Sequence, residues 1–313
     1  MIKPYSILLT AGAAALIACS GLCSAQQIPD KTVPRPSRPI LQDEPPAPSS
    51  AAALEAKLRS EVQANPNSAD LLYRLALLLQ QENKPRESLQ VFTQAAGLQK
   101  PTADQLRSVA LNYVLLNDYD DAVHWLRVAL GFEPNNVSVL YSLGRCFYTQ
   151  NNFPQAEVAF LRILQLQPRN IKAMENLGLT YDGENKPDLA EKALRTAATW
   201  DAAQPSADPW PALDLGVFLL DQSRTAEAVP FLTRAASLAP SLPLARLTLG
   251  RALVLTGQSA TGIKELEAAA QLDPQNPKIH FELGHAYRDA GQLDKARTEF
   301  ALSKSLYGSH NQN

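Results

Sequence analysis

The chain has 313 residues, of which 45% are hydrophobic, 7% are aromatic and 14 are glycine. This balance favours helices that pack through leucine and alanine, and it predicts an all-α fold. The 29 Lys and Arg residues nearly balance the 31 Asp and Glu residues, and the net charge is -2. Such a chain lacks the strong positive charge that attracts nucleic acid or an anionic membrane surface, so neither is an expected partner.

Residues 1–25 have the order of an export signal: a basic residue, an apolar run over 7–18 and then small residues. The run is too short for a membrane span. Two processing patterns remain open. The string Leu-Ile-Ala-Cys that ends at Cys19 resembles the lipobox of bacterial lipoproteins, which would place a lipid on Cys19. The string Cys-Ser-Ala that ends at Ala25 fits ordinary signal peptidase, which would release a soluble protein that starts near Gln26.

Residues 26–50 contain seven prolines and little that could be buried, so they are predicted to form an extended, disordered tether. Both processing patterns predict export, either to the periplasm or outer membrane as a lipoprotein, or as a secreted protein. Membrane contact is expected only through a lipid on Cys19. An apolar stripe then predicts one capping helix over 51–66, formed by Leu54, Leu58 and Val62.

A Leu-Gly pair recurs through the rest of the chain. The glycines of these pairs are spaced by 34, 38, 34 and 34 residues, at Gly144, Gly178, Gly216, Gly250 and Gly284. The same large–small pairing occurs one and two repeats earlier, at Ala110 and Ala76. Seven units are therefore predicted over 67–310, near 69–102, 103–136, 137–170, 171–208, 209–242, 243–276 and 277–310.

Other positions keep the same register in each unit. A large apolar residue follows the small one by three positions, and further small and large residues recur in the second half of the unit at helical spacing. The middle of each unit carries an Asn or a Gly, which can close a helix in the left-handed conformation. In one unit Ser223 has this place. These residues are Asn83, Asn117, Asn151, Asn185, Ser223, Gly257 and Gly291. Each unit is therefore predicted to be a helix, a tight turn and a second helix.

This pattern of Leu, Gly, Tyr, Ala, Phe, Ala and Pro resembles the tetratricopeptide repeat family over roughly residues 69–310. The resemblance implies a right-handed superhelical solenoid of about seven hairpins, whose first helices line a concave groove that binds other proteins. One unit, 171–208, has four extra residues, which predict a longer loop around 201–207. The family's clamp for a C-terminal carboxylate needs paired Lys and Asn residues on adjacent first helices, and here Asn176 stands alone.

Carried onto this sequence, the resemblance also implies which side chains face the groove. Most are aromatic or charged, and aromatic residues and arginine are the types that dominate binding hot spots. The predicted partner-binding residues are Arg107, Tyr141, Arg145, Tyr148, Lys172, Glu175, Asp182, Trp210, Leu213, Arg251, Phe281, His285 and Arg288.

Catalysis is not predicted, because the chain has four histidines and no convergent set of catalytic groups. His280 and His285 are five residues apart, which turns them away from each other on a helix. No phosphate-binding glycine loop or nucleophile elbow is present. Cys146 is the single cysteine beyond the signal region and is predicted to be a small buried residue. We therefore expect no cofactor and no metal.

Two functional hypotheses follow. The first is a scaffold in the bacterial cell envelope that binds partner peptides or helices in the groove. The second is a non-catalytic accessory subunit of an envelope hydrolase or processing enzyme. The C-terminal end has no counterpart of the capping helix, so Phe300, Leu302 and Leu306 are expected to be partly uncovered there and to offer a surface for self-association.

Overall fold

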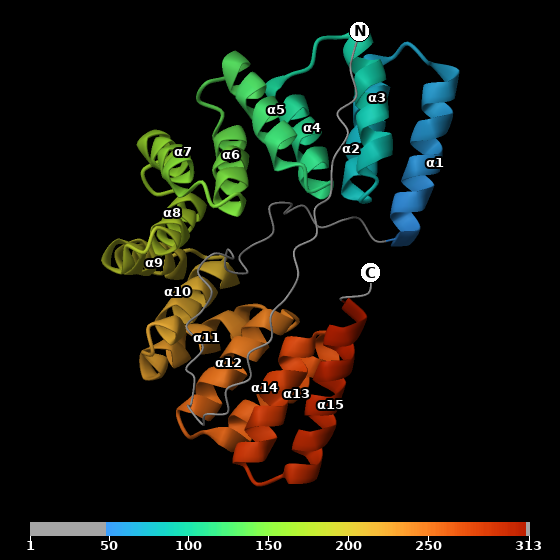
Figure 1. The fold of residues 1–313 in the computed structure, drawn as a ribbon. Helices are drawn as coiled ribbons and strands as arrows, with labels where there is room; N and C mark the ends of the chain where they lie inside the picture. Colours follow the sequence, from blue (N-terminus) through green and yellow to red (C-terminus); the bar gives the residue numbers. More distant parts are fainter. Residues whose placement is uncertain (1–47, 311–313) are drawn as a thin grey trace, which may run out of the picture. The chain divides into compact units, whose positions relative to one another are not determined.

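The computed structural model describes residues 48–310, which form fifteen α-helices and, over that range, no strand (Figure 1). The predicted export signal, Cys19 and the tether up to residue 47 lie outside the described residues. The first helix, α1 (Pro48–Ala64), begins three residues before the predicted capping helix. Its Leu58 is buried against leucines of the next helix.

The fourteen remaining helices pair into seven hairpins, each with a first and a second helix. The first helices are α2 (Ala69–Gln81), α4 (Ala103–Leu115), α6 (Val137–Thr149), α8 (Ile171–Gly183), α10 (Pro209–Asp221), α12 (Pro243–Leu255) and α14 (Pro277–Asp289). The second helices are α3 (Pro85–Leu98), α5 (Tyr119–Phe132), α7 (Phe153–Leu166), α9 (Pro187–Ala202), α11 (Thr225–Leu238), α13 (Ser259–Leu272) and α15 (Leu293–His310). The predicted all-α solenoid of about seven hairpins is confirmed.

The turn within every hairpin contains one residue with a positive φ angle, and these are the seven residues predicted from the sequence. In the third hairpin Asn151 has a φ of 57°. Its N–H donates to the carbonyl of Tyr148 at 3.0 Å, and the next N–H donates to the carbonyl of Phe147 at 2.8 Å. These bonds satisfy carbonyl groups at the end of the first helix, so the left-handed residue ends that helix and starts the turn.

The two helices of a hairpin approach closely where the first helix carries its recurrent small residue. A Cβ atom added to Gly178 would lie 2.7 Å from Cγ of Leu194 and 3.1 Å from the backbone nitrogen of the same residue. Gly144 meets the Phe160 ring in the same way. Glycine is therefore required here by the packing of α8 on α9 and of α6 on α7.

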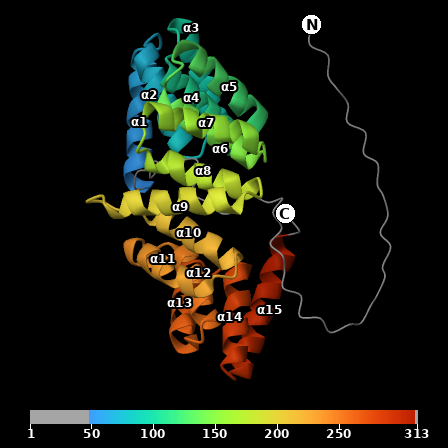
Figure 2. The ribbon, with the colours of Figure 1, turned by 90° about the vertical axis from the view of Figure 1, so that its left-hand side faces the viewer.

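The first helices of consecutive hairpins contact one another along the array, whereas the second helices of consecutive hairpins make no comparable contact among the described residues. Figure 2 shows α6, α8 and α10 following one another along the stack. Because the spacing is tighter between first helices, the stack curves toward them. They line its inner face.

The four extra residues of the fourth unit are divided between a helix and a loop. The second helix α9 has 16 residues, against 14 in α7 and α11, so two extra residues extend it and two lengthen the following loop. Asp201 closes this loop, because its carboxylate accepts from the N–H of Asp208 at 2.8 Å and lies 3.8 Å from the Arg234 guanidinium. The loop over 203–208 is thus longer than the corresponding loops over 167–170 and 239–242, as predicted, but it begins two residues later than expected.

The C-terminal end is less apolar than the sequence predicted. Phe300 is half-buried and Leu302 is 40% exposed, but Leu306 is only 8% exposed. Leu306 lies three residues after Ser303, whose hydroxyl donates to the carbonyl of Pro277 at 2.8 Å. Residues at this spacing share a helix face, and that face of α15 lies against the start of α14. The prediction that Leu306 would be uncovered was wrong.

Replacing Gly178 with Ala should destabilise the array by about 1–3 kcal/mol, the usual cost of overpacking a tight contact. The matched control is Gly131→Ala, where the added Cβ meets nothing within 4 Å. That change should be neutral or slightly stabilising, since alanine is the better helix former. Urea unfolding followed by circular dichroism measures both, and equal midpoints for the two variants would contradict the packing argument.

Acid should release α1 from the array. Lys84, which donates to Glu55 at 2.6 Å, and Arg59 together lower the pKa of the Glu55 carboxyl to about 2. A lowered pKa stabilises the docked helix above the ordinary carboxyl pKa, and this stabilisation is lost as the pH falls toward 2. Hydrogen exchange in α1 should therefore accelerate, relative to α2, between about pH 5 and 2.

The Glu55→Gln variant should weaken the protection of α1 at neutral pH and flatten this pH dependence. Glu61→Gln is the control, because Glu61 makes only a 3.9 Å pair with Lys57 inside α1. A wild-type α1 that keeps its protection down to pH 2 would exclude the proposed role of Glu55.

Candidate protein-binding surface

The candidate site is the inner face of the stack, and every predicted partner-binding residue lies on a first helix. The register explains this placement. Relative to the small residue of each first helix, these side chains stand six or three positions before it, or one or four after it. Such spacings return to one face of an α-helix.

Burial divides the predicted residues into three groups. Four are exposed: Lys172, Arg251, Phe281 and Arg288. Four are half-buried: Arg107, Tyr141, Trp210 and His285. Five are buried: Arg145, Tyr148, Glu175, Asp182 and Leu213. Eight of the thirteen are therefore accessible to a partner, and the buried five shape the face that carries them.

A buried polar cluster joins the first helices α6 and α8. The Asn176 side chain accepts from the Arg145 guanidinium at 2.9 Å and donates to the Tyr141 hydroxyl at 3.2 Å. It also donates to the backbone carbonyl of Lys172 at 2.8 Å. Asn176 is 1% exposed and Arg145 is 4% exposed, so the bond between them is shielded from water and fixes the relative position of the two helices.

In the sequence pattern Asn176 stands alone. The structure places Arg145 and Tyr141 beside it, from 31 and 35 residues earlier in the chain. This separation is close to one repeat, so the sequence did contain a signal: residues about one repeat apart lie on adjacent first helices.

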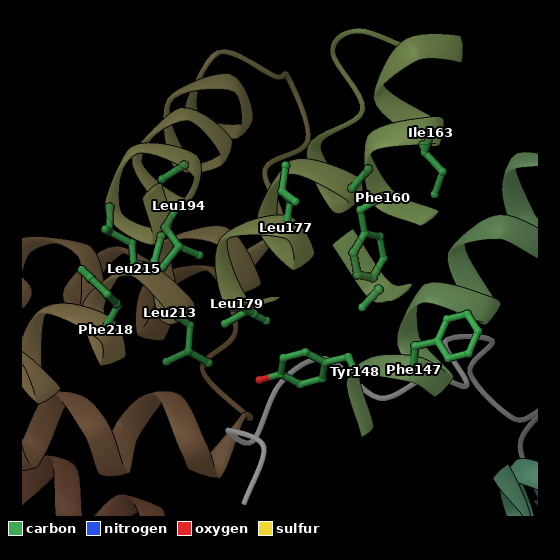
Figure 3. Packing of buried hydrophobic residues seen from close by; sticks show 14 of the residues in the cluster. Phe147, Tyr148, Phe160, Ile163, Leu177, Leu179, Leu194, Leu213, Leu215 and Phe218 are labelled. Atoms are coloured by element: carbon green, nitrogen blue, oxygen red, sulfur yellow. The ribbon is translucent and has the colours of Figure 1, made fainter. Parts of the chain in front are cut away.

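Apolar side chains continue the inner face over α6, α8 and α10. Figure 3 shows Tyr148, Leu179 and Leu213 on one side of these helices, opposite the side where Phe160 and Leu194 pack. Leu179 was not among the predicted residues, although it has the same position in its unit as Arg145. Leu179 was missed because the predicted residues were chosen mainly for polar and aromatic side chains, and Leu179 is aliphatic.

The charges of the inner face differ along the array. Buried carboxylates belong to α8 and α10, in Glu175, Asp182 and Asp214. Exposed arginines belong to α12 and α14, where Arg251 lies 3.8 Å from Glu282. Among the predicted residues of these helices, the charged groups that a partner can reach are therefore cations, Lys172 on α8, Arg251 on α12 and Arg288 on α14.

Cys146 is fully buried in α6, as predicted. Burial raises the pKa of its thiol to about 12, so the thiol stays protonated and is a poor nucleophile. Over residues 48–310 no group of His, Cys, Asp and Glu is arranged to hold a metal ion. No helix in this described part has the length and apolar character needed to cross a bilayer.

Comparison with protein families gives matches to tetratricopeptide repeat models. Two of them are described as tetratricopeptide repeat and match 109–171, 141–209 and 277–310. A third, described as TPR repeat, matches 250–291.

A curated relative is the interferon-induced protein with tetratricopeptide repeats 2 of Cricetulus griseus. It is 31% identical over 140 residues, which make up 44% of this chain and 25% of the relative. The chain thus spans about a quarter of that protein's length.

Two solved structures share the fold. Yeast Tom70 is 22% identical, with a TM-score of 0.64 over 82% of this chain and 55% of Tom70. A tetratricopeptide repeat protein from Parabacteroides merdae is 16% identical, with a TM-score of 0.63 over 76% of this chain and 93% of that one. At these identities the likeness concerns the fold alone.

Replacing Asn176 with Ala should destabilise the α6–α8 contact by about 1–3 kcal/mol, because it removes a buried acceptor of the Arg145 guanidinium. Tyr141→Phe is the milder control: it removes only the 3.2 Å bond from Asn176 and should cost about 1 kcal/mol or less. Urea unfolding compares them. If Asn176→Ala were no more costly than Tyr141→Phe, the cluster would not be what holds the helices together.

Proposed function

Because this chain belongs to the tetratricopeptide repeat proteins, a family that generally mediates protein–protein interactions, we propose that it is a non-catalytic scaffold. It binds partner peptides or helices along the inner face of its first helices. The observation that carries this proposal is the run of accessible aromatic and charged side chains on six consecutive first helices, α4 to α14.

The chemistry of this run suits peptide recognition. Tyr141 and Trp210 are half-buried, so each ring has a fixed position and loses little entropy when a partner covers it. Lys172 and Arg251 are exposed and offer charged hydrogen bonds at separate points. Fixed rings with charged groups between them can hold one extended or helical segment in a defined register.

The bacterial cell envelope is the proposed place of action, and its support is the signal-like pattern of residues 1–25. Lipid on Cys19 would anchor the scaffold to a membrane, whereas cleavage before Gln26 would release it. An accessory role beside an envelope hydrolase or processing enzyme is the alternative. The intact mass of the mature protein distinguishes the two N-termini, and co-purification of a hydrolase would favour the alternative.

Reversing two charges on the inner face should reduce partner capture. In the Lys172→Glu, Arg251→Glu variant, capture by in-cell crosslinking should fall about tenfold, which corresponds to about 1.4 kcal/mol of lost binding energy. The control reverses two exposed lysines of second helices, in Lys192→Glu, Lys264→Glu. It has the same net charge as the variant and should capture partners as the wild type does.

Quantitative mass spectrometry of the crosslinked proteins gives the measurement. Loss of the same partners in both double variants would trace the effect to net charge and not to the inner face. Full capture by the inner-face variant would mean that partners bind elsewhere.

A further inference from the structure

The end face is defined here by five positions of the last hairpin, α14 and α15. In the preceding hairpin the corresponding residues belong to one cluster that packs α12 and α13 against α14: Leu247, Val254, Ile263, Leu266 and Ala270. One repeat of 34 residues later, the five positions hold Phe281, Arg288, Arg297, Phe300 and Lys304. Two positions have become aromatic and three have become basic.

The basic residues are specific to the last hairpin. At these three positions, none of the six preceding hairpins has a Lys or an Arg. The Arg288 and Arg297 side chains are 52% and 78% exposed, and Lys304 is also exposed. Where every other hairpin packs on its successor, the last hairpin therefore presents three cations to solvent.

The middle of the end face remains aromatic. Phe281 is 42% exposed, and its ring centroid lies 6.0 Å from that of Phe300. The His285 ring lies 4.5 Å from Phe281 and 5.1 Å from Phe300. One repeat earlier, Leu247 and Leu266 are 4% and 1% exposed within the cluster that includes α14. The end face thus keeps apolar groups at positions that a further helix covers elsewhere in the array.

We propose that the end face docks an acidic amphipathic helix of another protein. Its apolar side covers Phe281 and Phe300, and its carboxylates pair with Arg297 and Lys304. A helix fits because the same positions, one repeat earlier, receive the helix α14. Acidic residues fit because a guanidinium binds a carboxylate through two parallel hydrogen bonds. The end face shares Phe281 and Arg288 with the inner face of the stack but extends beyond it, since Arg297, Phe300 and Lys304 belong to the second helix α15.

The charges of the end face also bear on what else could cover it. Asp289 lies 3.0 Å from Arg288 and Asp294 lies 3.3 Å from Arg297, but both carboxylates are at least half exposed. Exposed pairs of this kind contribute little and can exchange for a partner's carboxylate. A second copy of this chain fits less well, because a two-fold interface brings the same basic surface together twice.

The test uses two synthetic helices and the purified protein. The first probe is a fluorescent, stapled helix of about five turns (~18 residues) with leucine along one face and glutamate on both flanks. The second has lysine in place of each glutamate. Fluorescence anisotropy should give a Kd at least about tenfold lower for the glutamate probe, and this preference should weaken as salt is added.

The Arg297→Glu, Lys304→Glu variant should prefer the lysine probe, whereas Lys192→Glu, Lys264→Glu should behave as the wild type. Equal binding of both probes, or an unchanged preference in the end-face variant, would overturn the proposal. The proposal would also be overturned if sedimentation showed that the wild type is a dimer and the end-face variant a monomer, because the occupant would then be a second copy. The groove variant Lys172→Glu, Arg251→Glu should still bind the glutamate probe, so the two proposals can fail separately.

Discussion

The close approach of the two helices in each hairpin is the constraint on which the rest of this structure depends. At Gly178 the packing leaves no room for a Cβ atom, because Leu194 lies directly over it. The contact also determines the rotation of both helices about their axes. Once that rotation is set, residues three and four positions apart share one face of each helix. The inner face and the contacts with neighbouring hairpins are then formed by the same positions in every unit.

Because that contact is repeated, the structure of one hairpin predicts that of the next along the stack. Each hairpin packs on the next, so the same positions form the seams and the inner face throughout. The helices and their turns could be read from the period, whereas the side of the first helices that lines the inner face was implied by the family resemblance. The turn at Asn151 shows why: its left-handed φ is a local property of one residue and its neighbours.

Features that depend on particular pairs of residues could not be read from the period. Arg145 has the position of a groove residue but is buried, because Asn176 of the next unit holds its guanidinium. Leu306 is buried on the face that Ser303 ties to the start of α14. In the first case the outcome depends on the side chain that the adjacent helix supplies, and in the second on a hydrogen bond to a backbone carbonyl of the adjacent helix. A repeat pattern specifies that a neighbour exists but not its chemistry.

The last hairpin shows how a single register can serve both folding and recognition. Among the described residues no further helix covers the outer seam of α14 and α15, and an uncovered seam that was wholly apolar would invite further copies of the same chain. Arg297 and Lys304 hydrate this seam and repel another copy of it, while Phe281 and Phe300 keep its centre apolar. Apolar contact then supplies affinity, and the cations decide which partner can make that contact. Basic residues at three of the five seam positions thereby convert a packing surface into a selective one without changing the fold beneath it.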